Sequence, residues 1–374
     1  MEKQPPPERP TVLVGDLHYA TLRSTLPGLA AQVLKQRPCL ILSPRDTVAH
    51  DIVAPVPVHY VGLPKKHPWP VVAVSLAVGL WRFFRRHRPA LVHLHACALH
   101  YYWVWAGVMR ILRIPYGVTF HSYVGSHEAG SPAERFRRYL KFREWEFFLL
   151  PKALFVSTVS TALLRHLHDR FKKRWDIRVI PNGFDFPSEN PPSPTPPLPP
   201  TPYLCSLCGG LPGKGADWLL FAFQTVLQTE PNVHLLLCGS GTARLKSLIG
   251  LLRLDHRVHL MDFVPRAQVP YLLRNSLFYV HPTRQETFGL AVLEALGEGK
   301  AVVAPEIGGL VDYLKNDENA HLVPVLDVAA LADGMIRLLK DPAYRSRLEK
   351  GARQTADRFT WSQVAPRYLQ IYPS

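Results

Sequence analysis

Strand-like and helix-like segments alternate along this chain, and one proline-rich stretch divides the alternation into two halves. Before that stretch, helical segments separate apolar runs such as TVLVG, CLILS and ALVHLHA; after it, they separate YLCSLCGG, VHLLLCGSG and KAVVAPE. Alternation of this kind predicts parallel sheets joined by right-handed crossover helices. We therefore expect an α/β chain with two Rossmann-like, doubly wound parallel-sheet domains.

The proline-rich stretch, residues 187–202, holds nine prolines among its sixteen residues. Proline lacks a backbone donor and favours extended polyproline II, so the stretch predicts a linker. The N-terminal domain then covers residues 1–186 and the C-terminal domain residues 203–356. Because doubly wound sheets bind ligands at the carboxyl ends of their strands, we expect the domains to face each other across a cleft.

Composition predicts a globular protein and fits a cytoplasmic location. The apolar content is 47%, yet no apolar run reaches the roughly 18 residues that span a bilayer. The longest run, residues 71–80, ends at a basic segment and predicts a buried helix. The polar start lacks a signal-peptide pattern, and the five cysteines form no disulfide framework. Cys205 and Cys208 lie three positions apart in a strand-like run, where their side chains point to opposite faces of the sheet. We therefore interpret both as core residues and expect no metal site.

The net charge of +15 lies almost wholly in the first half. Residues 1–186 hold 26 Lys and Arg against 12 Asp and Glu, whereas the remainder holds 18 against 17. Residues 81–89 and 133–152 interleave basic with aromatic side chains, which is typical of helices on anionic membranes. The alternatives are a buried helix with snorkelling Arg stems and a nucleic-acid surface. Because the charge is one-sided, we favour a peripheral position on the cytoplasmic membrane face, with no nucleic-acid partner.

Residues 281–309 carry the strongest indication of chemistry. Glu286 precedes Phe288 and Gly289, and Glu294 lies inside an apolar, helix-like run with seven residues between the two glutamates. A carboxylate in such a run is costly unless donors surround it, and a helix start offers N–H groups to phosphate. The segment therefore suits a nucleotide-sugar, which presents a diphosphate and two sets of hydroxyls. The structural alternative is that Glu294 pairs with a buried cation and Glu286 caps the helix.

This segment resembles the signature of the retaining glycosyltransferases of family 4, which have the GT-B fold. Their pattern runs Pro-Ser-x-x-Glu-x-Phe-Gly, then seven residues from Glu to Glu, an apolar strand and Gly-Gly. In this chain the matching residues are Pro282-Thr283, Glu286, Phe288-Gly289, Glu294, 301–304 and Gly308-Gly309. The resemblance covers residues 150–371 well and the first third in outline. It implies that residues 357–374 form a closing helix that crosses back to the N-terminal domain.

The resemblance also implies roles for the residues of this motif. Glu286 would contact hydroxyls of the donor sugar, and Glu294 would hold the ribose, with the N–H groups of Phe288, Gly289 and Leu290 nearby. The family retains the anomeric configuration, and no carboxylate is established in it as a covalent nucleophile. The two glutamates are therefore not interpreted as the acid and nucleophile of a hydrolase.

Lys214 follows a glycine-rich turn between a strand-like and a helix-like run, where N–H groups and a cation can bind phosphate. The alternative is a solvated loop lysine. The family places an Arg and a Lys here to neutralise the leaving diphosphate, but this chain has Gly210 where the Arg is expected. The resemblance further assigns Gly239 to a glycine turn, and Phe263 and Val264 to the segment whose backbone holds the nucleotide base.

Candidates in the first half are weaker. His121 follows an apolar strand-like run, and its position resembles the family histidine that approaches the donor sugar. The chain contains 17 histidines, and most histidines in a protein are structural, so the alternative is that His121 has a structural role. The family's Gly-Gly turn, which contacts the phosphates, is missing from this chain. Gly15 is the only glycine nearby, so we assign it to this contact. His18 is a further candidate in the same segment. In the second half, Arg284 is a candidate to replace the missing arginine.

These features predict a retaining hexosyltransferase that moves a sugar from a nucleotide-sugar, a UDP- or GDP-sugar, to a lipid-linked or saccharide acceptor. A cation and helix N-termini would stabilise the departing diphosphate without a metal, and no cofactor is expected. One alternative is a nucleotide-sugar epimerase of the same fold, which would turn over donor without an acceptor. Another is a non-catalytic binding protein for sugar nucleotides, because the Arg and the Gly-Gly turn are missing.

Overall fold

The computed structural model describes residues 9–15, 20–43, 56–61, 69–96, 101–123, 140, 143–185 and 197–373. The chain divides into two compact units: unit 1 is Met1–Gly183 with Trp361–Ser374, and unit 2 is Phe184–Thr360. Within the described ranges, no helix is long and apolar enough to cross a membrane. Most of the predicted linker, residues 187–196, lies outside the described residues.

Unit 1 is built on a seven-stranded parallel sheet with the order β3-β2-β1-β4-β5-β6-β7. Its strands are β1 (Thr11–Val14), β2 (Cys39–Ser43), β3 (Val58–Tyr60), β4 (Leu91–Ala96), β5 (Tyr116–Phe120), β6 (Val156–Thr158) and β7 (Ile177–Val179). The strand order reverses between β1 and β4, where Thr11 lies opposite Leu91. The carboxyl ends of strands at such a reversal are the ligand-binding edge of doubly wound sheets.

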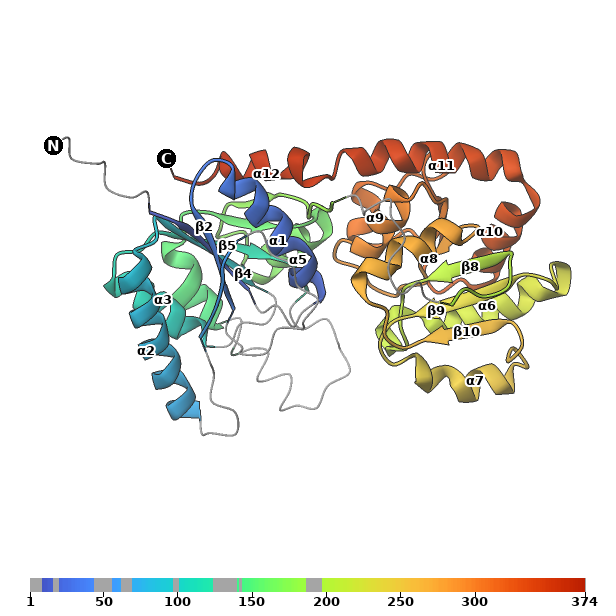
Figure 1. The fold of residues 1–374 in the computed structure, drawn as a ribbon, viewed down its shortest axis with the longest axis horizontal. Coiled ribbons are helices and arrows are strands. Elements are labelled where there is room, and N and C mark those ends of the chain that lie inside the picture. Colours follow the sequence, from blue (N-terminus) through green and yellow to red (C-terminus); the bar gives the residue numbers. More distant parts are fainter. Residues whose placement is uncertain are drawn as a thin grey trace. The chain divides into compact units, whose positions relative to one another are not determined.

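Helices accompany this sheet, and one of them comes from the far end of the chain (Figure 1). They are α1 (Ala20–Leu34), α2 (Trp69–His87), α3 (Tyr102–Ile111), the short η1 (Trp145–Leu149) and η2 (Leu150–Lys152), α5 (Thr161–Arg170) and α12 (Trp361–Leu369). α12 packs against α1. Trp361, Val364 and Tyr368 of α12 share one buried core with Leu13 of β1 and Leu29 of α1. The C-terminal residues are therefore part of the hydrophobic core of unit 1.

Unit 2 repeats the architecture with a six-stranded parallel sheet of order β10-β9-β8-β11-β12-β13. Its strands are β8 (Tyr203–Ser206), β9 (His234–Cys238), β10 (Val258–Met261), β11 (Tyr279–Val280), β12 (Val302–Pro305) and β13 (His321–Val323). The order reverses between β8 and β11, whose residues Cys205 and Tyr279 pair. The loops that follow these two strands hold the sequence-predicted residues Lys214 and Glu286.

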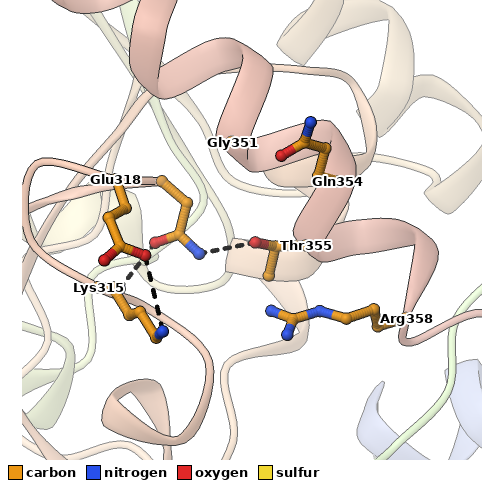
Figure 2. A pocket seen from close by; sticks show the side chains of 7 residues that line it. Lys315, Glu318, Gly351, Gln354, Thr355 and Arg358 are labelled. Carbon is orange, nitrogen blue, oxygen red and sulfur yellow. Dashed lines mark hydrogen bonds and ion pairs between the residues drawn. The ribbon is translucent and has the colours of Figure 1, made fainter.

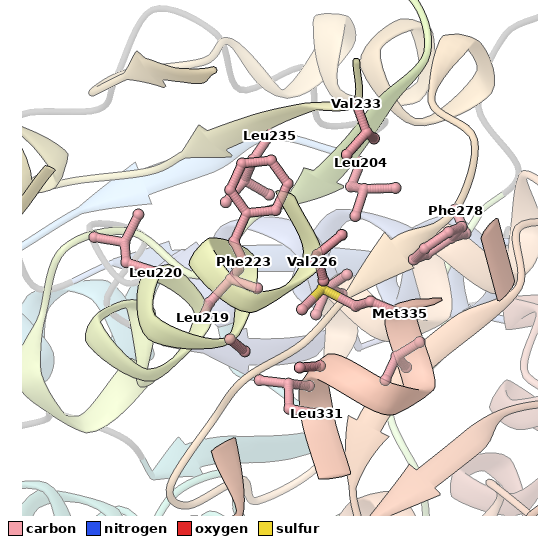
Figure 3. Packing of buried hydrophobic residues seen from close by; sticks show 14 of the residues in the cluster. Leu204, Leu219, Leu220, Phe223, Val226, Val233, Leu235, Phe278, Leu331 and Met335 are labelled. Carbon is pink, nitrogen blue, oxygen red and sulfur yellow. The ribbon is translucent and has the colours of Figure 1, made fainter. Parts of the chain in front are cut away.

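The helices of unit 2 share its core with the strands of the sheet. They are α6 (Ala216–Thr229), α7 (Lys246–Leu251), α8 (Val269–Asn275), α9 (Leu290–Gly297), α10 (Val328–Lys340) and α11 (Pro342–Asp357), with single turns η3 (Pro212–Lys214), η4 (Thr242–Leu245), η5 (Arg266–Gln268) and η6 (Gly308–Asp312). Leu219, Phe223 and Val226 of α6 pack with Leu204 of β8 and Met335 of α10 (Figure 3). Burial of this apolar surface is the main favourable contribution to folding.

The prediction of two doubly wound parallel sheets is confirmed. Cys205 and Cys208 are both buried, as predicted for core residues, and the described residues contain no cluster of three or more potential metal ligands. The helix predicted at residues 71–80 forms as α2, but it is buried on one face only. Val74 is 63% exposed and Val78 43%, so the prediction of a buried helix is wrong for its outer face.

Candidate functional site

Two loops interlock at the carboxyl ends of β8 and β11 in unit 2. Gly215, with φ +72°, lies between Lys214 and the start of α6, and a Cβ on it would lie 1.8 Å from the carbonyl oxygen of Pro282. The N–H of Arg284 donates to the carbonyl of Gly213 at 3.2 Å. Glycine is therefore required at 215, because it permits both the left-handed φ and the close approach of the second loop. This contact brings Lys214 next to the loop after β11.

Where these two loops meet, polar groups of both contact the carboxylate of Glu286. Its Oε2 lies 3.4 Å from Nζ of Lys214 and 3.3 Å from Nε2 of His281. Its Oε1 accepts hydrogen bonds from the N–H groups of Thr287 at 3.0 Å and Phe288 at 3.4 Å. Burial by itself would raise the pKa of Glu286, but the charge of Lys214 and the bonds to its oxygens outweigh it and lower the pKa to about 2. The carboxylate is therefore ionised at every physiological pH.

His281 is a residue of this cluster that the sequence reasoning missed. It follows β11 directly, its side chain is only 3% exposed, and its Nδ1 lies 3.1 Å from the hydroxyl of Tyr279. A hydroxyl on one ring nitrogen and a carboxylate on the other orient the ring. The signal was available in principle, because His281 ends an apolar strand just as His121 does.

The Gly308-Gly309 pair at the end of the motif supports the loop of Glu286. The N–H of Gly309 donates to the carbonyl of Glu286 at 3.0 Å. A Cβ on Gly308 would lie 1.9 Å from that same oxygen, and a Cβ on Gly309 would lie 2.0 Å from the carbonyl oxygen of Thr287. The two glycines thus allow η6 to pack directly on the backbone of the loop and to hold it in place.

Glu294 has a different environment from Glu286. It lies one turn into α9, where its Oε1 is 3.9 Å from the guanidinium of the half-exposed Arg266. Burial raises the pKa of Glu294, and Arg266 opposes this only in part. Gly289, with φ +90°, precedes Leu290 at the start of α9 and makes no side-chain cap. The carboxylate of Glu294 therefore has oxygen atoms left to accept hydrogen bonds from a ligand. The start of the same helix suits an anion.

The remaining predicted residues of unit 2 also follow strands of its sheet. Phe288 is buried, and the hydroxyl of Tyr313 donates to its carbonyl at 2.9 Å. Phe263 follows β10 and is 73% exposed, with Val264 beside it half-exposed. Gly239, with φ +121°, makes the turn after β9. All of these lie at the carboxyl edge of the unit 2 sheet.

Gly210 lies at a position where no side chain fits. Its N–H donates to the carbonyl of Ser240 at 3.0 Å, and a Cβ on it would lie 1.9 Å from the carbonyl oxygen of Gly241. The N–H of Gly241 in turn donates to Oδ1 of Asp262 at 2.7 Å, which anchors the neighbouring turn. The glycine that replaces the family's arginine therefore allows the two turns to touch.

Arg284 makes its own contacts on the surface of α6. It forms an ion pair with Asp217 in the first turn of that helix, and its guanidinium lies 5.1 Å from the ring centroid of Trp218. A nearby carboxylate partly neutralises this charge. Among the described cations near Glu286, Lys214 is the one that directly contacts its carboxylate.

The first-half candidates lie in unit 1. His121 follows β5, is buried, and its Nε2 lies 2.8 Å from Nδ1 of His95. Burial lowers the pKa of His121 to about 4, so the ring is neutral at pH 7. Gly15 follows β1, and its N–H donates to the carbonyl of Leu42 at 3.1 Å. His18 lies outside the described residues.

A separate cavity of about 330 Å³ in unit 2 holds none of the predicted site residues. Figure 2 shows its polar lining, in which Lys315 pairs with Glu318 at 3.6 Å and Thr355 bonds a neighbouring amide. That amide belongs to Asn319, which also bonds the carbonyl of Tyr313. These groups satisfy one another and hold the loop after η6 against α11.

Comparisons with known proteins agree on one family. Residues 199–355 match the family described as "Glycosyl transferases group 1", and residues 30–186 match "Glycosyltransferase Family 4". The chain is 31% identical over 239 residues to the phosphatidyl-myo-inositol mannosyltransferase of Mycobacterium tuberculosis, covering 58% of this chain and 63% of the relative. It is 31% identical over 169 residues to the D-inositol 3-phosphate glycosyltransferase of Corynebacterium efficiens, covering 43% and 40%. The matches thus span less than two thirds of these relatives.

Solved structures share the architecture at low sequence identity. Sucrose-phosphate synthase from Thermosynechococcus elongatus superposes with a TM-score of 0.77 at 20% identity, covering 97% of this chain and 98% of that one. HepE from Anabaena, solved in complex with UDP and glucose, superposes with a TM-score of 0.75 at 19% identity, again covering 97% and 98%. These similarities establish a common fold across both units.

Proposed function

Because the chain belongs to the family 4 glycosyltransferases of GT-B fold, we propose that it transfers a hexosyl group from a nucleotide-sugar to a hydroxyl acceptor. The observation that carries this proposal is the ionised Glu286 beside Lys214, at the carboxyl edge where β8 and β11 diverge. A diphosphate needs a cation and N–H donors, and a hexose needs fixed acceptors for its hydroxyls. The site offers both within one pair of loops.

Lys214 would bind the diphosphate and stabilise its charge as the glycosidic bond breaks. Its side chain is 42% exposed, and its ammonium contacts Glu286 at a long 3.4 Å, so a phosphate oxygen can reach it. The start of α9 adds a second positive end. In this proposal a lysine and a helix terminus supply the electrostatic stabilisation, and no step requires a metal.

Glu286 would orient the donor sugar rather than attack it. Both of its oxygens are already engaged, one by two backbone N–H groups and the other by Lys214 and His281. Such contacts stabilise the ionised carboxylate and make it a weak nucleophile. This arrangement argues against a covalent intermediate on this carboxylate, and retention of configuration is proposed because the family 4 glycosyltransferases retain it.

The nucleotide of the donor can be identified by thermal shift with UDP-, GDP- and ADP-sugars, since stabilisation follows affinity. The function itself is tested by donor consumption with and without membrane lipids as acceptors. We expect consumption only when an acceptor is present. Conversion of the donor sugar without acceptor would indicate an epimerase, and binding without turnover would indicate a non-catalytic protein; either result contradicts the proposal.

Replacing Glu294 by alanine is expected to weaken donor binding by about 10- to 100-fold. Hydrogen bonds to a charged group contribute roughly 1.5–3 kcal/mol each, and Glu294 is assigned to the ribose hydroxyls. Titration calorimetry with the stabilising donor measures the change. Glu318→Gln removes an exposed carboxylate of the same unit and serves as the matched control. Equal donor affinity in Glu294→Ala and the control would remove Glu294 from the donor site.

We also propose that α2 of unit 1 lies against an anionic membrane that carries or surrounds the acceptor. The outer face of α2 exposes Val71, Val74, Val78 and Trp81, at helical spacing, while its inner face is buried. Its last two turns add Arg82, Arg85 and Arg86, and the helix contains no acidic residue. α2 packs beside α3 (Figure 1). An apolar stripe with flanking arginines suits an interfacial helix.

Vesicle sedimentation tests this membrane face. Replacing Arg82, Arg85 and Arg86 by glutamine is expected to weaken binding to phosphatidylglycerol vesicles on the order of 100-fold, at about 1 kcal/mol per charge. The matched control, in which Gln replaces Arg165, Lys172 and Lys173, removes equal charge from exposed positions of the same unit. Equal loss in both variants, or equal binding of the native protein to neutral vesicles, would contradict the assignment to α2.

A further inference from the structure

Oε2 of Glu286 has two donors that differ in how firmly they are held. Nζ of Lys214 lies 3.4 Å away, and the lysine side chain is 42% exposed. Nε2 of His281 lies 3.3 Å away, and the histidine side chain is only 3% exposed. A solvated ammonium on a flexible stem can change its partner at little cost, whereas a buried polar group that loses its partner is destabilised. The two contacts therefore indicate two different roles.

The ring of His281 is fixed by the sheet of unit 2. Its backbone N–H donates to the carbonyl of Val303 in β12 at 2.9 Å. Its Nδ1 lies 3.1 Å from the hydroxyl of Tyr279, and the two rings stack with centroids 5.9 Å apart. Tyr279 is fully buried in β11, and the backbone of Leu207, just after β8, also bonds its hydroxyl. His281 thus belongs to a rigid framework that three neighbouring strands build.

The carboxylate of Glu286 decides which nitrogen of His281 carries a hydrogen. Burial opposes ionisation of Glu286, yet its donors hold its pKa at about 2, so it is ionised at neutral pH. An ionised carboxylate only accepts hydrogen bonds, and Nε2 of His281 must therefore donate. In the neutral ring Nδ1 is then an acceptor, to which the hydroxyl of Tyr279 donates. Burial raises the pKa of Tyr279 well above its ordinary value, so this hydroxyl keeps its proton.

The hydrogen bonds of Glu286 are complete before any substrate binds. Oε1 accepts from the N–H groups of Thr287 at 3.0 Å and Phe288 at 3.4 Å, and Oε2 contacts Lys214 and His281. Each carboxylate oxygen has two lone pairs, so these four donors occupy the carboxylate. If Lys214 moves to a phosphate oxygen, one acceptor position on Oε2 opens. Among the described residues, His281 is the donor that then remains on this oxygen.

We propose that His281 is a positioning residue for Glu286: its Nε2–H holds Oε2 in place while Lys214 exchanges from this oxygen to the diphosphate of the donor. The position that Lys214 leaves is then open to a hydroxyl of the donor sugar. The exchange of Lys214 rests on the proposed function, whereas the hydrogen bond between His281 and Glu286 rests on the geometry alone. All of these groups belong to unit 2. His281 itself needs no contact with the donor.

Three variants separate this hydrogen bond from the packing of the ring. The amide nitrogen of glutamine can occupy the place of Nε2 of histidine, so His281→Gln keeps a donor for Glu286. His281→Leu has a similar volume and removes that donor. Tyr203→Phe is the control, because it removes one hydrogen bond of a fully buried hydroxyl, to the carbonyl of Leu272, at the amino end of β8. Circular dichroism and thermal melting report whether each variant folds.

The first readout is the ¹⁵N spectrum of histidine-labelled protein without donor, in which the signals lost in His281→Gln identify His281. We expect Nε2 of His281 to carry a hydrogen at pH 7 in the native protein and in Tyr203→Phe. In Glu286→Gln we expect these signals to shift, because a neutral amide can donate as well as accept. A native His281 with its hydrogen on Nδ1 only, or an unchanged spectrum in a folded Glu286→Gln, would overturn the proposal.

The second readout is the steady-state kinetics with the donor that thermal shift identifies. His281→Leu is expected to lower kcat/KM on the order of tenfold, because a hydrogen bond to a charged group is lost. His281→Gln should recover most of this loss, and Tyr203→Phe should behave like the native protein. A purely structural role of the ring would affect the glutamine and leucine variants alike. Equal activity of these two variants therefore contradicts the proposal.

The third readout tests the exchange of Lys214 by titration calorimetry with the free nucleoside diphosphate of that donor. In His281→Leu, Lys214 is the remaining described donor to Oε2, so its release to a phosphate is more costly. We expect this variant to bind the diphosphate several-fold more weakly, and His281→Gln to bind it like the native protein. Unchanged binding in a folded His281→Leu would refute the exchange. If no nucleoside diphosphate binds, both the proposed function and the exchange fail, whereas the spectrum decides the hydrogen bond independently.

Discussion

Replacing Glu286 by glutamine is expected to lower the turnover of a nucleotide-sugar on the order of 100-fold or more. Removal of one fixed electrostatic contact at the reacting group has effects of about this size. Here the change also leaves the ammonium of Lys214 and the ring of His281 without their carboxylate. Steady-state kinetics with the donor identified by thermal shift measure the loss. Glu306→Gln, at an exposed carboxylate just after β12, is the matched control and should retain full activity.

The same variant is expected to change how stability depends on pH. The pKa of Glu286 falls from 4.5 to about 2 on folding, so its ionised form stabilises the native state above pH 4.5. This contribution, about 3 kcal/mol, is lost as the pH falls from 4.5 towards 2. Urea unfolding of the native protein and of Glu286→Gln should therefore show a difference at pH 7 that shrinks on acidification. A difference independent of pH would show that Glu286 is not held by its ionic contacts.

Restoring the family's arginine by Gly210→Arg is expected to destabilise the protein by several kcal/mol rather than improve it. The Cβ alone would lie 1.9 Å from the carbonyl oxygen of Gly241, a distance that no relaxed structure contains. The atoms that this Cβ would meet belong to the backbone of a tight turn, so relief requires the turns after β8 and β9 to separate. Effects above about 4 kcal/mol are exceptional among point mutations and arise from a few mechanisms, of which steric overpacking is one. The free energy of unfolding, measured in urea, tests this expectation.

A second glycine of unit 2 provides the control for this variant. Gly250 lies in α7, where a Cβ would meet its nearest neighbour at 3.9 Å, so Gly250→Ala should be neutral or stabilising by about 0.5–1 kcal/mol. Gly210→Ala should already lose most of the stability that Gly210→Arg loses. A folded Gly210→Arg with raised activity would show that the two turns separate freely and that the site tolerates the second cation.

Local patterns in the sequence were enough to predict the architecture. Strand-like runs bounded by helical segments depend on neighbours along the chain, so they indicated two doubly wound sheets. The motif around Glu286 and Glu294 likewise identified the loop, the helix start and the family. The sequence also placed Lys214 at the end of the turn after a strand, where the structure finds it beside Glu286.

Contacts between distant segments were not predictable in this way. The sequence left open whether Arg284 replaces the missing arginine, and the structure shows it paired with Asp217, 67 positions earlier. His281 looked like the last residue of a strand, yet its ring bonds Glu286. The outer face of α2 was expected to be buried, but only its inner face is covered. Each of these depends on which surfaces meet after folding, which no local pattern records.

The amino-acid sequence by itself therefore determined the fold class, the family and the residue types available for donor chemistry, because these depend on periodicity and short motifs. Only the tertiary structure decided their environments. It made Glu286 strongly acidic by surrounding it with donors, whereas Glu294 keeps a raised pKa with one distant cation. It also placed His95, 26 positions away, against His121. Burial and hydrogen bonding are properties of the packed chain, so identical residue types acquire different chemistry.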